Sequence, residues 1–176
     1  MSSGRKPVAI SGVSASNEAE IMTVYPSIAA YGLGRILGSI YECVPLRIMG
    51  VKLSNLLFVL PTAPIPALLY FMQKATGQKY VLTNRSFQIW HALGSRKITQ
   101  VALSDITDVI IRIQPGQEFY KAGDLILVGG KGNDELMTLA GVPYPHIFRQ
   151  TILEARDSRQ MVAKSLETIK ARPVVA

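Results

Sequence analysis

The feature that most constrains this chain is an uncharged apolar stretch, residues 54–73, followed six residues later by a hairpin-like run at residues 80–90. The stretch approaches the roughly 20 apolar residues that a helix needs to cross a bilayer. The later run, Tyr-Val-Leu-Thr-Asn-Arg-Ser-Phe-Gln-Ile-Trp, has strand-forming residues on both sides of turn residues, as a β-hairpin requires. A chain in this order predicts a small soluble domain held at a membrane surface.

The composition supports membrane association. Hydrophobic residues make up 48% of the 176 residues and charged residues only 18%, where about a quarter is usual in soluble proteins. The net charge of +7 attracts both anionic lipid and nucleic acid. Proteins that bind single-stranded nucleic acid use aromatic residues on an exposed basic face. Here Tyr80, Phe87 and Trp90 are instead expected in a core or against the membrane.

Three prolines at the centre of the uncharged stretch leave its path open. Pro61, Pro64 and Pro66 each lack a backbone N–H, which makes one continuous helix through them costly. The alternatives are a strongly kinked span and a re-entrant hairpin, with residues 54–60 leading in and residues 67–72 leading out. Backbone at mid-membrane depth needs protein or water around it, so the hairpin would also require partners or shallow insertion.

Basic residues on both sides of the stretch favour the hairpin. Arg47 and Lys52 precede it, and Lys74 and Lys79 follow it. Positively charged flanks tend to remain on the cytoplasmic side of a membrane, so both ends are expected there. The side chains predicted to enter the membrane are Leu56, Leu57, Phe58, Pro61, Pro64, Pro66, Leu68, Leu69 and Phe71.

The residues before this stretch predict a tail and a shorter helix. Residues 1–23 are small and polar, and a flexible tail is expected. Residues 24–73 are predicted as one membrane-associated segment, whose first part contains three charged residues and therefore favours a helix in the membrane plane or packed on protein. Gly34 and Gly38 permit close approach of another helix in lipid, although a chance match in a glycine-rich segment explains their spacing equally well.

Beyond Gly77 the chain changes to short β-like runs separated by turn residues. Five or six such runs at about ten-residue spacing indicate a small sheet sandwich or barrel. A long helix is predicted from Pro145 to just before Pro173, because apolar residues recur at three- and four-residue steps. It is longer than a small barrel needs, so residues 157–176 are expected to project as a helix and tail, either solvated or in contact with a partner. The predicted contact residues are Val162, Leu166 and Ile169.

Three short sequences after the apolar stretch resemble parts of a known family. They are Tyr-Val-Leu-Thr-Asn-Arg at residues 80–85, Val-Ala-Leu-Ser-Asp-Ile-Thr-Asp-Val at residues 101–109 and Leu-Ala-Gly-Val-Pro-Tyr-Pro at residues 139–145. In this order they are similar to bacterial PH-like (pleckstrin-homology-like) domains that follow membrane segments, over roughly residues 79–156. The resemblance implies a mainly β fold with a barrel of about seven strands in residues 74–156, capped by the long C-terminal helix. Many members carry two clean transmembrane helices, from which the charged and proline-broken segments here depart.

The sequence offers no recognisable catalytic, metal or cofactor site. His91 and His146 are the only histidines, Cys43 is the only cysteine, and no metal-binding spacing or nucleophile motif occurs. The glycine-rich residues 129–132 lack the Gly-Lys-Ser/Thr ending of a phosphate loop. We therefore expect a protein that is not an enzyme and that binds no cofactor, metal or nucleic acid.

The family resemblance implies a structural, accessory or assembly subunit at the bacterial cytoplasmic (inner) membrane, with its soluble domain facing the cytoplasm. The expected partners are membrane lipids, together with integral membrane subunits or a second copy of the chain. The alternative is a peripheral sensor of anionic lipid, because each basic residue close to an anionic leaflet contributes about 1 kcal/mol of attraction. The residues predicted to contact headgroups or a partner are Lys74, Lys79, Arg85, Arg96 and Lys97.

Overall fold

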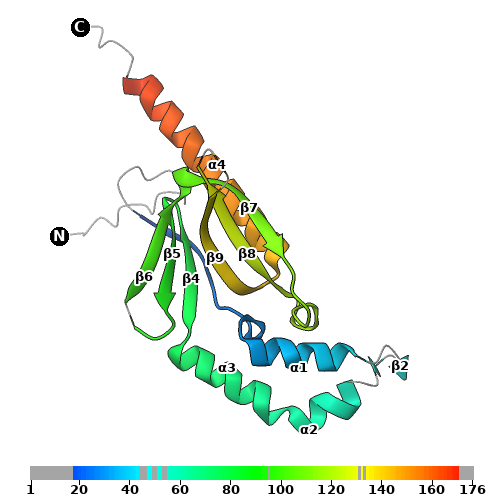
Figure 1. Ribbon diagram of the computed structural model, residues 1–176. Coiled ribbons are helices and arrows are strands. Elements are labelled where there is room, and N and C mark those ends of the chain that lie inside the picture. The colour runs from blue at the N-terminus through cyan, green and yellow to red at the C-terminus, as the bar shows by residue number, and fades with distance from the viewer. Residues whose placement is uncertain are drawn as a thin grey trace, which may run out of the picture.

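A computed structural model describes residues 18–43, 47–48, 51–52, 55–94, 96–130, 132 and 134–170. Within these residues, seven strands form two antiparallel sheets, ordered β1-β4-β5-β6 and β7-β8-β9 (Figure 1). The strands of the first sheet are β1 (Glu20–Val24), β4 (Gln78–Thr83), β5 (Ser86–His91) and β6 (Lys97–Ala102); those of the second are β7 (Ile106–Arg112), β8 (Ala122–Gly129) and β9 (Asp134–Pro143).

The helices gather in two places. One group follows β1 and lies below both sheets, and the long helix α4 (Pro145–Lys170) runs along the sheets and past them (Figure 1). The first group is joined by the short hairpin of β2 (Arg47–Ile48) and β3 (Val51–Lys52). Its members are η1 (Ile28–Ala30), α1 (Gly32–Glu42), η2 (Asn55–Val59), α2 (Leu60–Thr62) and α3 (Pro64–Thr76); two further 3-10 turns are η3 (Leu103–Asp105) and η4 (Glu118–Tyr120).

The β4–β5 hairpin forms where the turn residues predict it. The Thr83 hydroxyl accepts the Ser86 N–H at 2.9 Å and so closes the turn, as Ser and Thr side chains often do. Leu82 pairs with Phe87 in the register, and both are fully buried. The alternation of this hairpin therefore places one face in the core of the protein.

The strand β1 corrects the prediction of a flexible tail for residues 20–23, and residues 1–17 of that tail lie outside the described residues. β1 pairs antiparallel with β4, and the Ala19 N–H and Asn84 side chain join the two segments at 3.0 Å. The strand escaped prediction because Glu20–Val24 is short, and its partner lies almost sixty residues further on. The helices of residues 25–77 are consequently inserted between two neighbouring strands of one sheet.

The two sheets share one core but do not close into the expected barrel. Among the described residues no hydrogen-bonded ladder joins them, because η3 turns the chain from β6 into β7. The first half of α4 covers their contact: Phe148 and Ile152 are fully buried, and Phe148 packs on Phe87 with ring centroids 6.0 Å apart. The prediction of short strands followed by a long C-terminal helix is thus confirmed. The described fold is mixed α/β and not mainly β, because helices are inserted after β1, and the expected closed barrel is wrong.

The prolines begin helices and do not form the tip of a hairpin. Pro61 and Pro64 lie in the first turns of α2 and α3, where the missing N–H has no helical partner to lose. At the prolines the chain bends but does not turn back, so α2 leads on into α3 (Figure 1). The chain turns back earlier, at the β2–β3 hairpin. The expectation of a re-entrant hairpin with its tip at the prolines is therefore wrong. No helix in the described part of the chain is both long and apolar enough to cross a membrane.

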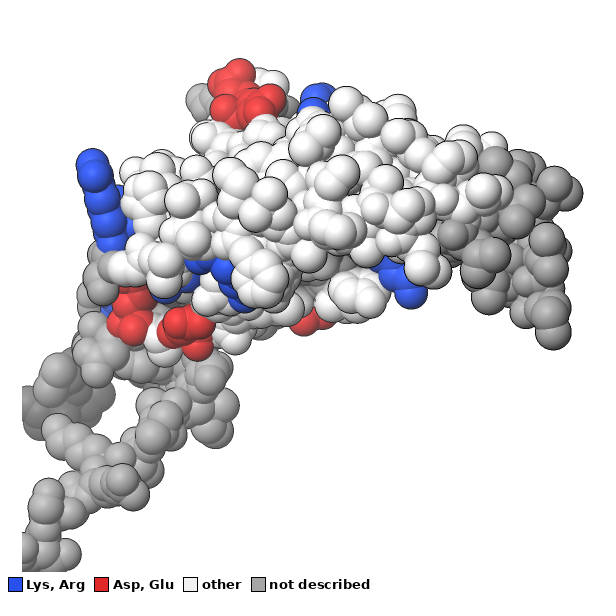
Figure 2. All heavy atoms as spheres, turned by 90° about the horizontal axis from the view of Figure 1, so that it is seen from below, with Lys and Arg blue, Asp and Glu red and all other residues white. Residues whose placement is uncertain are grey.

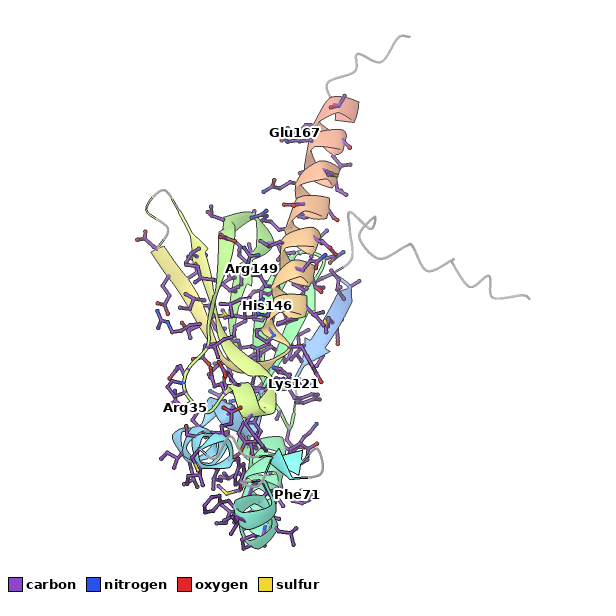
Figure 3. The ribbon with its side chains drawn as sticks, turned by 90° about the vertical axis from the view of Figure 1, so that its right-hand side faces the viewer. Arg35, Phe71, Lys121, His146, Arg149 and Glu167 are labelled. Carbon is purple, nitrogen blue, oxygen red and sulfur yellow. The ribbon has the colours of Figure 1, made fainter. Side chains whose placement is uncertain are left out.

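The two groups of helices define opposite ends of the molecule. Figure 3 shows Phe71 of α3 at one end and Glu167 of α4 at the other. Arg149 ties α4 to β7, since its Nε donates to the Val109 carbonyl at 2.5 Å and its Nη2 contacts Asp108 Oδ1 at 3.0 Å. Past this attachment α4 extends beyond the sheets (Figures 1 and 3).

Candidate functional site

The end of the molecule formed by α1, α2 and α3 is an apolar face. Seen from below, it is almost free of charged atoms, which lie at its margins (Figure 2). Twelve of the 21 large apolar side chains exposed among the described residues belong to this part of the chain. They are Tyr25, Tyr31, Leu33, Ile36, Ile40, Leu57, Leu60, Ile65, Leu68, Tyr70, Phe71 and Met72.

Helix α3 contributes most because it hardly packs on its own protein. Leu68 is 62% exposed and Phe71 is 69% exposed, while Gln73 is the only buried residue of the helix. A helix that is apolar on nearly all sides is normally found inside a large core or in a membrane. Patches of this kind on a monomer mark a binding surface for lipid or protein.

Helix α1 is amphipathic, with its other face fixed to the sheet domain. Leu33, Ile36 and Ile40 point outward, and Leu37 and Tyr41 are buried. This spacing places the exposed residues on one stripe of the helix. The helix therefore presents an apolar stripe from a firmly held position.

The Gly34 and Gly38 pair serves packing within the chain. A Cβ on Gly34 would lie 2.0 Å from the Ile28 carbonyl oxygen, and one on Gly38 would lie 2.1 Å from that of Gly116. Both distances are far below any real Cβ contact, so only glycine permits this approach. The close approach proposed for lipid is thus used against the chain itself.

A buried carboxylate holds the loop on which α1 rests. Asp124, on β8, accepts the Gln117 amide at 2.7 Å and the Gly141 N–H at 2.9 Å, and also the Gln114 amide. Arg35 of α1 donates to Gln114 in turn. Buried carboxylates are stable when hydrogen bonds satisfy them in this way. The network links α1 to the three-stranded sheet.

A second set of contacts links the helices to each other. The Tyr41 hydroxyl lies 2.6 Å from the Thr62 hydroxyl, which joins α1 to α2. The Tyr41 ring also packs against Phe119, with centroids 4.9 Å apart. Tyr41 is 1% exposed, so the apolar face has a buried layer behind it.

The structure divides the predicted basic residues into two groups. Lys74 lies in the last turn of α3, and the register of β4, β5 and β6 places Lys79 and Lys97 on either side of Trp90, close to the end of that helix. Arg96 directly precedes Lys97, the first residue of β6. Arg85 instead lies in the β4–β5 turn, at the far end of the strands. Four of the five predicted residues are thus attached at the end of the strands that meets α3, although the Lys97 ammonium donates to Gln100 further along β6.

Most residues predicted to insert into a membrane lie on the apolar face. Leu57, Leu68 and Phe71 are exposed, as are Pro61 and Pro64. Phe58, Pro66 and Leu69 are half-buried, and the Leu56 side chain lies outside the described residues. Sequence reasoning missed the α1 stripe and Tyr25, Tyr31 and Tyr70. Tyrosines that flank an apolar stretch are a known sign of a membrane interface, and they could have been found.

The predicted partner-contact residues lie at the opposite end. Val162 and Leu166 are half-buried, and the Ile169 side chain is outside the described part of the chain. Met161, beside them, is 68% exposed. The structure thus separates this stripe from the apolar face by the length of the sheets (Figure 3).

Polar side chains also gather away from the apolar face. Among the described residues, no three His, Cys, Asp or Glu side chains gather as metal ligands. The Glu18 carboxylate accepts hydrogen bonds from Ser86, Thr83 and Gln88 at 2.5–2.8 Å, and those from Ser86 and Thr83 hold the pKa of Glu18 below its usual value. This carboxylate fastens the start of the described chain to the outer face of β4 and β5.

Comparison of the chain with protein-family models, curated proteins and solved structures finds no significant match.

Proposed function

We propose that this protein is a non-enzymatic accessory subunit that docks on a membrane through its apolar face. The observation that carries the proposal is α3, which leaves Leu68, Phe71 and their neighbours uncovered and bears no charge before Lys74. Burying one such side chain is worth roughly 1.5–3 kcal/mol. Several together would hold the protein in the outer part of a bilayer or against integral membrane subunits.

The basic residues beside the face support a position at an anionic leaflet. Lys74, Lys79, Arg96 and Lys97 lie at that end, and each contributes about 1 kcal/mol when close to anionic lipid. Such residues concentrate on the cytoplasmic side of membranes. We therefore place the sheet domain in the cytoplasm of a bacterial cell, beneath its inner membrane.

A PH-like architecture remains part of the proposal. Seven antiparallel strands in sheets of four and three, followed by one long helix, support it. The open join between β6 and β7 and the helices inserted after β1 are departures that such an assignment has to accommodate. Fold alone does not assign a function, so the proposed role depends on the apolar face.

The second half of α4 supplies the other contact in this proposal. It extends away from the apolar face (Figure 3), and so would point away from the bilayer. Val162, Leu166 and Ile169 would bind a second copy or another subunit there. The protein would thus connect a membrane to a component beside it.

Flotation of the full-length protein with vesicles tests the docking. We expect it to float with neutral phosphatidylcholine vesicles and more strongly with vesicles that contain anionic lipid. A protein that remains at the bottom of the gradient with both would contradict the proposal.

Gentle detergent extraction tests the accessory role. We expect an integral membrane subunit to co-purify in a fixed ratio. A protein that purifies alone and floats only with anionic vesicles would favour a peripheral lipid sensor, which the four basic residues support as a second candidate.

A further inference from the structure

We propose that a hollow between α3 and Tyr25–Pro26 binds the phosphate of a phospholipid whose headgroup also carries a hydroxyl donor. The hollow is lined by Tyr25, Pro26, Tyr70, Gln73 and Lys74 and has a volume of about 120 Å³. Pockets for drug-sized ligands are larger, typically ~300–1,000 Å³, so this one suits a single small group. The proposal rests on the membrane docking argued above.

The position of the hollow fits a headgroup. Tyr25 and Tyr70 are 41% and 51% exposed and stand at the margin of the apolar face, where α3 meets the sheet domain. Tyrosine and lysine are the residues that lie at the level of lipid headgroups. A lipid whose chains lie along α3 would place its phosphate here.

The charge of the hollow selects an anion. Lys74 Nζ lies 3.8 Å from the centroid of the Tyr25 ring and 5.8 Å from that of Tyr70. The ammonium group thus already occupies the aromatic faces that would otherwise attract a quaternary ammonium. Within the described residues Lys74 makes no salt bridge to a carboxylate. Its N–H groups can therefore donate to a phosphate.

Gln73 provides an independent sign of a ligand. Its side chain is 5% exposed, and its Nε2 donates to the Pro26 carbonyl. Its Oε1 is buried and has no hydrogen-bond partner among the described residues. Buried acceptors are almost always paired, so this oxygen calls for a donor.

A second hollow of about 240 Å³ adjoins the first, since Pro26 and Gln73 line both. Tyr31, Thr76 and Tyr80 also line the second hollow. A hydroxyl-bearing substituent on the phosphate would enter it and donate to Gln73 Oε1. Phosphatidylglycerol has this chemistry, whereas phosphatidylmethanol has the same charge and lacks the hydroxyl donors.

Native mass spectrometry of the full-length protein in detergent micelles tests the assignment. The micelles contain phosphatidylglycerol or phosphatidylmethanol, and the retained lipid is counted for wild type, Lys74→Gln and Lys164→Gln. Lys164 is exposed on α4 at the other end, so its variant is matched in charge. We expect wild type to retain phosphatidylglycerol better than phosphatidylmethanol, and Lys74→Gln to lose about five-fold in retention, the equivalent of about 1 kcal/mol.

Two further arms keep the result unambiguous. Tyr25→Phe with Tyr70→Phe keeps both rings, so it should leave Lys74 in place and the protein folded; unchanged circular dichroism of every variant is the check. Inorganic phosphate added at millimolar concentration should not displace the lipid, and displacement would show that free phosphate is the ligand instead.

Equal retention by Lys74→Gln and Lys164→Gln would overturn the proposal, and so would equal retention of the two lipids. In either case flotation of the wild type with phosphatidylcholine vesicles would still support docking. Failure to float with any vesicle would contradict the docking itself, which separates the two conclusions.

Discussion

Helix α3 and the second half of α4 both leave apolar side chains uncovered, but they differ in charge. α3 carries a single charged residue, Lys74, at its end, whereas residues 157–170 of α4 contain five charged residues. A helix with a narrow apolar stripe and a charged remainder is soluble by itself. A helix that is apolar around most of its surface needs a permanent cover. Under the proposed function, α3 would make a lasting contact with the membrane, and the second half of α4 would make a more selective contact with a protein.

The largest effect is expected from substitutions that remove the proposed membrane contact of α3. Leu68→Ser with Phe71→Ser removes two exposed apolar side chains, each worth roughly 1.5–3 kcal/mol if buried in lipid. We expect at least a hundred-fold weaker partition of the full-length protein into phosphatidylcholine vesicles, measured by flotation.

Met161→Ser is the matched control, because Met161 is 68% exposed on α4 and Phe71 is 69% exposed. It should leave partition unchanged. If Met161→Ser weakens partition as much as the double substitution in α3, exposed apolar side chains at the two ends contribute equally. The proposed difference between α3 and α4 would then be wrong.

A smaller loss is expected at α4. Val162→Ser with Leu166→Ser removes a stripe that is already half-buried on the helix, so the two changes should weaken an assembly by about 2–3 kcal/mol in total. Co-purification or the self-association constant measures this loss. Vesicle partition and the thermal unfolding of the protein should not change, and a fall in the unfolding temperature would show that the stripe belongs to the core.

The support beneath the apolar face can be tested in α1. Gly38→Ala places a methyl group against the Gly116 carbonyl, whereas a Cβ on Gly32 would have its nearest neighbour 3.9 Å away. Overpacking costs roughly 1–3 kcal/mol, so Gly38→Ala should lower the free energy of unfolding by about that amount in urea titration. Gly32→Ala should be neutral or slightly stabilising. Equal effects would show that α1 is not fixed on the loop.

The effect that is absent at neutral pH concerns the sheet domain that separates the two ends. Burial raises the pKa of Tyr80 to about 12 from a usual value of 10.0. The unfolded chain therefore loses this proton first, so the stabilisation is complete below pH 10 and declines by about 1.4 kcal/mol per pH unit towards pH 12. Burial raises the pKa of Tyr120 to about 12 as well.

Tyr80→Phe should flatten the alkaline decline in unfolding free energy, and Tyr144→Phe, at an exposed position, should not. An unchanged pH profile in Tyr80→Phe would show that the phenol is not protected by the fold.

Local patterns determined the kinds of element in this protein. The turn residues between the strand-forming residues of 80–90 predicted a hairpin, because such residues close a tight turn between two strands. The three- and four-residue steps between apolar residues after Pro145 predicted α4, because such spacing places them on one face of a helix. The absence of charge between residues 54 and 73 predicted a membrane-associated segment, and in the structure most described side chains of residues 57–72 are exposed.

Only the tertiary structure decided where these elements meet. β1 pairs with β4 across the inserted helices, Gly38 faces Gly116, and Gln73 is buried beside Pro26. These contacts join residues far apart in the sequence, so no periodicity within either segment contains them. The prolines show the same limit: each one excludes a helix interior, but whether it marks a turn or the start of a new helix depends on what packs around it.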